Sequence, residues 1–160
     1  MKNVRATILA ALFCAVSATP ALADITAFIG ANTTPANRQV RGVALGAGLL
    51  VVAFEFEYAS TTDDPSALAA SLKTGIGNVL FQTPVALMGV QPYVTTGAGL
   101  YREELGTHQD TSIGFNTGAG AKITLTGQVR LRVDYRVFKL GSGALSSPAH
   151  RVYVGLNLKF

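Results

Sequence analysis

The strongest constraint on the fold of this chain is a regular alternation of apolar and polar side chains along several segments. From Gln128 to Phe138, three valines, a leucine and a tyrosine alternate with three arginines and an aspartate. From Arg151 to Phe160, Val152 and every second residue after it are apolar, and the residues between them are polar, small or tyrosine. Successive side chains of a β-strand point to opposite faces, so each segment predicts a strand with one apolar face. The pattern predicts an all-β protein.

Eight such segments can be traced along the chain. The fourth is the least regular, and its beginning at Asp64-Pro65 could instead open a short helix. Tracts that favour turns separate the segments, which predicts an antiparallel, up-and-down arrangement of eight strands. The expected strands are 24–32, 38–48, 52–58, 66–81, 91–101, 112–124, 128–138 and 151–160.

Alternation alone does not separate a soluble barrel from one that spans a membrane, because both have an apolar and a polar face. The composition is apolar, with 49% hydrophobic and 14% charged residues and a mean hydropathy of +0.35. Glycines also crowd the polar face, where a solvated strand would gain nothing from them but a narrow lumen needs small residues. These glycines are Gly97, Gly99, Gly114, Gly118 and Gly120. The sequence therefore predicts an eight-stranded transmembrane β-barrel.

The charged side chains fix which face looks into the barrel. An arginine that faces lipid at the midplane costs about 2–4 kcal/mol, so three of them on one strand must point inward. Buried charges persist only when they are paired and hydrogen-bonded, and the lumen of eight strands is narrow enough to be filled by side chains. We therefore expect a plugged lumen with a charge network of Glu55, Glu57, Lys73, Lys122, Arg130, Arg132, Asp134 and Arg136.

The N-terminus is typical of a cleavable signal peptide for Sec-type export. Lys2 and Arg5 precede an apolar run over residues 6–16, and Ala21-Leu22-Ala23 forms a small-residue cleavage site. We expect cleavage between Ala23 and Asp24, which leaves residues 24–160 as the barrel domain. The single cysteine, Cys14, would be lost with the signal, so disulfides and thiolate metal sites are not expected.

Loss of the two basic residues of the signal lowers the formal charge from +4 to +2, which is too small to indicate nucleic-acid binding. Two histidines 42 positions apart form no ligand cluster, so we expect no metal, and the glycine pairs lack a dinucleotide fingerprint. No cofactor is predicted.

Loop lengths give an orientation, because such barrels have short periplasmic turns and longer outer loops. The longer polar tracts are 33–39, 60–66, 102–111 and 139–150, and the short connections are 49–51 and 125–127. The connection over 78–90 departs from this rule, since it is long and apolar. Basic residues near the outer rim could bind the phosphates of lipopolysaccharide, or could form a snorkelling rim: Arg38, Arg41, Arg102, Lys139 and Arg151.

Three motifs resemble the small bacterial outer-membrane barrels related to the OmpA transmembrane domain and to OmpX. They are Gln91-Pro92-Tyr93 leading to Gly97-Ala98-Gly99-Leu100-Tyr101, Val133-Asp134-Tyr135-Arg136, and Gly155-Leu156-Asn157-Leu158-Lys159-Phe160. The resemblance covers residues 24–160. It implies an integral outer-membrane protein of a Gram-negative bacterium, in contact with outer-membrane lipid, whose last strand is read by the assembly machinery. By resemblance, that role falls on Tyr153, Leu156, Leu158 and Phe160.

The sequence favours a non-enzymatic barrel with a structural or surface-interaction role. The alternative is a pore for small solutes, which would require the lumen pairs to be absent or mobile. A lipid A-modifying enzyme is a remote third reading, because His108, Asp110 and Ser112 lie close together in one predicted loop but have no other support as a catalytic group. No catalytic residue is predicted.

Overall fold

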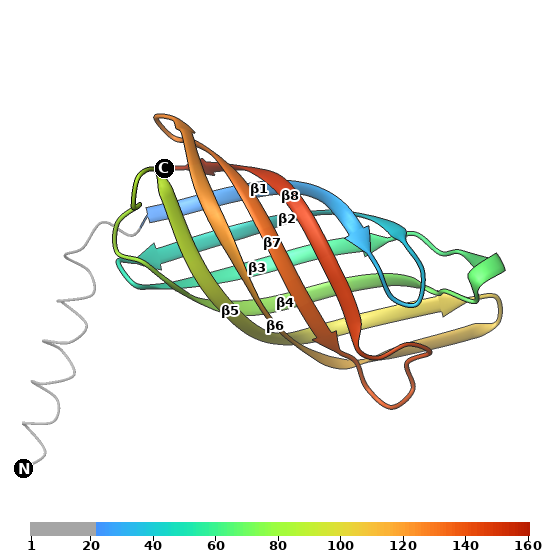
Figure 1. The fold of residues 1–160 in the computed structure, drawn as a ribbon. Coiled ribbons are helices and arrows are strands. Elements are labelled where there is room, and N and C mark those ends of the chain that lie inside the picture. The colour runs from blue at the N-terminus through green and yellow to red at the C-terminus, as the bar shows by residue number, and fades with distance from the viewer. Residues whose placement is uncertain (1–21) are drawn as a thin grey trace, which may run out of the picture.

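The computed structural model describes residues 22–160, which form eight antiparallel strands closed into a barrel in which each strand pairs with its sequence neighbours and β1 pairs with β8 (Figure 1). The predicted eight-stranded up-and-down fold is confirmed. The strands are β1 Leu22–Asn32, β2 Arg38–Leu49, β3 Val52–Thr61, β4 Ser71–Gln82, β5 Val90–Leu105, β6 His108–Thr126, β7 Val129–Lys139 and β8 Ala149–Lys159.

The predicted signal segment lies largely outside the described residues, and with it Ala21 of the cleavage site. Ala23 is the second residue of β1, where its carbonyl oxygen accepts a hydrogen bond from the backbone N–H of Phe160. Cleavage before Asp24 stays a prediction. We call the end of the barrel that carries Phe160 and the start of β1 the inner end, and the opposite end the outer end (Figure 1).

The register of the sheet shows that the strands are steeply tilted. A path across the strands from Pro92 of β5 through β6, β7, β8, β1, β2, β3 and β4 returns to β5 at Arg102, ten residues farther along. A closed sheet needs such an offset, and with eight strands its interior is just wide enough for side chains. The architecture therefore predicts a filled lumen rather than a wide channel.

The two faces of the barrel wall differ sharply in chemistry. The outward face carries large apolar side chains that are exposed over about half of their surface or more, as at Phe54, Phe56 and Leu156. The inward face carries the buried polar and charged residues. An exposed apolar band of this extent is typical of a surface that lipid covers.

The connections correct two sequence predictions. The connection predicted at 78–90 is only 83–89, because β4 remains paired through Gln82. The tract 102–111 is not a loop either: β5 and β6 stay paired to Leu105 and His108 and form a long hairpin at the outer end. The hairpin was missed because polar side chains can follow one another on a strand once it leaves the apolar band, and the end of β4 was missed because Val79, Leu80 and Phe81 are apolar in succession.

The short helix considered at the start of the fourth segment is present as a 3-10 turn, Pro65–Ala67. The Asp64 carboxylate caps it by accepting from the backbone N–H groups of Ser66 and Ala67. The Ser66 hydroxyl donates to the same carboxylate and lowers its pKa. Among residues 22–160, no helix is both long and apolar enough to cross a membrane.

A glycine of β5 shows how closely the wall is packed. A Cβ on Gly99 would lie 2.1 Å from the carbonyl oxygen of Gly75 and 2.7 Å from the Cα of Ile76, both backbone atoms of β4. We expect Gly99→Val to weaken the β4–β5 pairing and to lower the free energy of unfolding by about 1–3 kcal/mol. Urea titration of the refolded barrel in detergent, followed by circular dichroism, measures it. Ala98→Val, at the neighbouring outward position, is the control, and an equal loss in both variants would contradict the crowding.

Candidate functional site

The lumen begins at its inner end with a layer of charges around Asp24. The carboxylate of Asp24 accepts from Lys122 Nζ at 2.6 Å and from Arg130 Nη2 at 3.1 Å. Arg130 Nε also donates to the side-chain oxygen of Asn157 at 2.7 Å. These residues come from β1, β6, β7 and β8, so this layer ties together the strands that close the barrel. A vestibule of about 410 Å³ opens at the inner end and is lined in part by Asp24, Lys122 and Arg130.

The middle layer centres on Arg132, which is fully buried. Its guanidinium pairs with both oxygens of Glu55, donates to Asp134 at 2.8 Å and donates to the Tyr93 hydroxyl at 2.7 Å. The Tyr93 hydroxyl in turn donates to Asp134. The guanidinium also lies 5.1 Å from the ring centre of Tyr93, within the range of a cation–π contact. Its donors are thus shared among two carboxylates and a phenol.

The next layer toward the outer end is built around Arg136 and Arg151. Arg136 contacts Glu55 at 2.9 Å, Asp134 at 3.0 Å and Glu57 at 3.2 Å. Arg151 lies 3.1 Å from Glu57, and the Tyr153 hydroxyl donates to the second oxygen of Glu57 at 3.0 Å. Each carboxylate in this layer therefore contacts at least two donors.

Together these layers form the lumen charge network, in which the Thr26 hydroxyl joins the Asp24 layer to the middle one by accepting from Asn157 and from Arg132. Its five cations are Lys122, Arg130, Arg132, Arg136 and Arg151, and its four carboxylates are Asp24, Glu55, Glu57 and Asp134. In a setting with little water, a charge that loses its partner is far more costly than the intact pair is stabilising. The network therefore favours the one arrangement of the strands in which every charge is paired. Separation of these pairs is unfavourable, because it would leave buried charges without partners.

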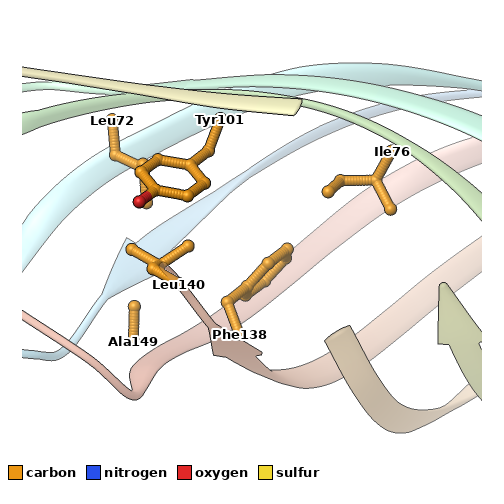
Figure 2. Close-up of a cluster of buried hydrophobic side chains, with 6 residues drawn as sticks. All are labelled: Leu72, Ile76, Tyr101, Phe138, Leu140 and Ala149. Atoms are coloured by element: carbon orange, nitrogen blue, oxygen red, sulfur yellow. The ribbon is translucent and has the colours of Figure 1, made fainter. Parts of the chain in front are cut away.

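An apolar cluster closes the lumen beyond the charges, toward the outer end. Figure 2 shows its six buried side chains, Leu72, Ile76, Tyr101, Phe138, Leu140 and Ala149. Phe138 also contacts the charge network, since the Arg151 guanidinium lies 4.3 Å from its ring centre. The cluster excludes water above the network, which strengthens the ion pairs below it.

The loop that follows β7 is held over this cluster. It contributes Leu140 to the apolar cluster, and the backbone N–H of Gly141 donates to the Tyr101 hydroxyl at 3.0 Å. The backbone N–H of Leu145 donates to Glu103 at 2.9 Å. The outer mouth is thus covered by a segment that is fastened to β5 at two points.

Seven of the eight residues predicted for the lumen network lie in it, and Lys73 does not. Lys73 is exposed on the outward face, and Thr74 points inward in its place, within 3.3 Å of Arg151. The prediction failed because the inward residues of β4 include Leu72 and Ile76 of the apolar cluster. Where the inward side chains of a strand are apolar, a polar residue can no longer be assigned to the inward face from its polarity alone.

Two residues of the predicted rim are misplaced in the same way. Arg151 is fully buried in the lumen, and Arg38 is buried at the outer end, where it donates to the carbonyl oxygens of Ala70 and Thr34. The other three, Arg41, Arg102 and Lys139, are exposed and point outward. Arg102 also contacts Glu104 at 2.6 Å.

The residues proposed for the assembly signal divide between the two faces of β8. Leu156, Leu158 and Phe160 are exposed on the outward side. Tyr153 faces the lumen, where its ring stacks on Phe28 at a centroid distance of 4.1 Å. Their recognition by an assembly machinery stays a prediction.

Sequence reasoning missed several members of the lumen network, above all Asp24, Asn157 and Tyr93. Asp24 and Asn157 share inward positions with Thr26 and Arg151, so the alternation could have indicated them. Tyr93 shares the inward face of β5 with Thr95 and Tyr101, but its partner Asp134 lies 41 positions away and is not apparent from sequence. The pairing depends on the closure of the barrel.

In the described part of the chain, residues 22–160, no group of three histidine, cysteine or acidic side chains is placed to hold a metal ion. In the triplet considered for catalysis, the Asp110 carboxylate accepts from the Tyr101 hydroxyl at 2.5 Å. This contact fastens the β5–β6 hairpin to the apolar cluster, which is a structural role for Asp110.

Comparison with known proteins relates the chain to others by structure alone: no family model matches it, and no curated protein matches by sequence. The N-terminal β-barrel domain of Pseudomonas aeruginosa OprF has a TM-score of 0.64 at 18% identity, over 87% of this chain and 97% of that one. Neisserial surface protein A (NspA) has a TM-score of 0.64 at 19% identity, over 87% and 95%. The outer membrane enzyme PagL has a TM-score of 0.52 at 11% identity, over 84% and 98%.

At sequence identities this low, the similarity shows a shared fold and not a shared activity. The presence of an enzyme among these structures shows that the same fold can serve different functions. What they share with this chain is the closed sheet of eight antiparallel strands. By strand number, closure and overall superposition, this chain has the fold of the small eight-stranded outer-membrane β-barrels.

Proposed function

We propose that this protein is an integral outer-membrane barrel with a closed lumen, and that it serves a structural or surface-interaction role rather than catalysis or transport. The observation that carries the proposal is the lumen charge network beneath the apolar cluster. Fully buried arginines bridge strands on opposite sides of the barrel, as Arg132 of β7 does to Glu55 of β3. Water-filled porins need a polar, solvated lumen, whereas this one is occupied by paired side chains.

Membrane placement is supported by the outward face. Its exposed apolar side chains extend around the barrel on every strand, for example at Ile29, Val43, Phe81 and Val94. In water such a surface would drive aggregation, and in a bilayer it is the natural contact with acyl chains. The neighbours OprF and NspA, which share the fold, support the same placement.

The test is fractionation of cells that produce the full chain, with gel migration of unheated and heated outer-membrane samples. We expect the unheated barrel to migrate differently from the heated chain, because a closed sheet resists detergent. Recovery of the folded protein from the soluble fraction without detergent would overturn the proposal.

Phe160 offers a sharper prediction within the same experiment. We expect Phe160→Ala to reduce the folded outer-membrane fraction severalfold, since the aromatic residue that directly follows β8 would be read during assembly. Phe54→Ala is the matched control, because both rings are exposed to a similar degree, 60% for Phe160 and 63% for Phe54. Equal losses in both variants would show that Phe160 acts only as one more apolar contact with lipid.

A further inference from the structure

A groove of about 780 Å³ runs along the outward wall of the barrel, over β1, β2, β3, β7 and β8. The groove forms because one outward position on the wall is occupied by a small residue, while its neighbours on the adjacent strands are larger. Ala27 of β1 lies in register between Val43 of β2 and Leu156 of β8, and all three side chains point outward. The wall is therefore lowest at Ala27, and larger apolar side chains form the sides.

The groove runs obliquely across the strands of the tilted sheet, between two neighbouring register rows, and rises toward the outer end from β7 to β3. One end is at Arg41, three residues from the outer end of β2, and the other reaches Leu131, two residues from the inner end of β7. Because the register rows climb toward the outer end, the two ends of the groove lie at different depths of the apolar band. Its lining is almost wholly apolar apart from the Arg41 end.

The outer end of the groove is polar and positively charged. The exposed Arg41 guanidinium lies there with the hydroxyl-bearing residues Tyr58 and Ser60. Within residues 22–160, no hydrogen bond or ion pair engages the Arg41 side chain. Across the sheet, Arg41 pairs with Ser60, Ser60 with Lys73, and Lys73 with Arg102. Three outward cations therefore lie in one register row over four adjacent strands.

We propose that this groove binds one acyl chain of a phosphorylated glycolipid of the outer leaflet, of the lipid A class, with a phosphate of the same molecule on Arg41. An apolar channel that ends in an unpaired guanidinium matches an amphiphile with a tail and an anionic head. Lys73 and Arg102 continue the row toward the outer end, where Arg102 is already paired with Glu104. The inference rests on the membrane placement proposed above.

A second copy of the chain fits the groove less well. In a twofold dimer with parallel barrels, the same patch of each copy would face its own equivalent, so the two Arg41 side chains would approach one another. Like charges brought together in an apolar interface oppose association. The charge at the end of the groove therefore favours a lipid phosphate over a partner barrel.

The test is native mass spectrometry of the refolded full chain, released from detergent after incubation with bisphosphorylated lipid A or with its dephosphorylated form. We expect one lipid A to be retained, and the dephosphorylated form to bind at least about tenfold more weakly, since it loses a charge-assisted hydrogen bond. Arg41→Gln should weaken lipid A binding to a similar extent, and Ala27→Leu should weaken binding of both forms because it fills the groove.

Two matched controls keep the result specific. Lys139→Gln removes an exposed outward cation that does not line the groove, and Ala98→Leu enlarges an exposed outward alanine on β5. Both controls should bind as the parent does. Equal binding by Arg41→Gln and its control, or by Ala27→Leu and its control, would overturn the site, as would a dimer peak that only Ala27→Leu abolishes. Heat-modifiable migration of every variant reports the folded membrane barrel separately, so failure of the site and failure of the proposed function remain distinguishable.

Discussion

Replacing Glu55 with glutamine is expected to lower the free energy of unfolding by about 3–5 kcal/mol. Glutamine keeps the size of the side chain but removes the charge that faces Arg132 and Arg136, both fully buried. The two guanidiniums would then share Asp134 and Glu57, and the lumen would hold five cations against three carboxylates. The measurement is urea unfolding of the refolded barrel in phospholipid vesicles, followed by circular dichroism.

The control for this variant is Glu104→Gln, because Glu104 also contacts an arginine but at the surface. Its partner Arg102 is half exposed, and pairs of that kind contribute about 0–1 kcal/mol. A Glu55→Gln barrel that unfolds at the same urea concentration as the control would mean that the lumen charges are solvated. The account of a closed, paired interior would then be wrong.

Placing a charge on the outward face should have the second-largest effect. Phe56 lies near the middle of β3, and its ring is 56% exposed on the outward side. If lipid surrounds this face, Phe56→Arg costs about 2–4 kcal/mol in vesicles, because the guanidinium must enter the hydrocarbon core or deform the bilayer. The same urea titration reports it.

Thr62→Arg provides the comparison, since Thr62 is exposed in the connection beyond the outer end of β3 and its side chain would reach water. We expect this change to leave stability within about 0.5 kcal/mol of the parent. If Phe56→Arg were equally mild, the outward face would not be in contact with lipid, whatever the fold.

The sequence was most informative where both faces of a strand keep one character along its whole length. In β7 the arginines alternate with apolar residues, and the structure places Arg130, Arg132 and Arg136 in the lumen. The cost of a charge in lipid predicts this inward direction from the sequence alone. In β4 the inward face changes from Leu72 to Thr74 to Ile76, so the same argument misassigned Lys73.

Arg151 shows a different kind of failure. Period-two alternation places it on the same face as Tyr153 and Asn157, which the structure confirms, but its position next to a long loop led to the prediction of a rim residue. Proximity to a loop indicates where a residue lies along a strand, whereas its odd or even position in the alternation indicates which face its side chain is on. The partners in the network remain out of reach of sequence, because contacts such as Lys122 with Asp24 join residues 98 positions apart through the closure of β1 on β8.

The apolar cluster at the outer end was not predicted for a related reason. Its members come from β4, β5, β7, β8 and the loop after β7, and each one alone resembles an ordinary outward residue. Only the register brings Leu72, Tyr101 and Leu140 together inside the wall. The cluster completes the closure that the charge network begins.

The most direct test of the closed lumen is single-channel recording from the purified full chain in planar lipid bilayers, with incorporation verified by heat-modifiable migration of the same sample. A lumen filled by the charge network and covered by the apolar cluster predicts a flat baseline, without reproducible steps, over a range of voltages and salt concentrations. Stable steps of uniform size that grow with salt concentration would show a continuous water path through the barrel and would contradict the account.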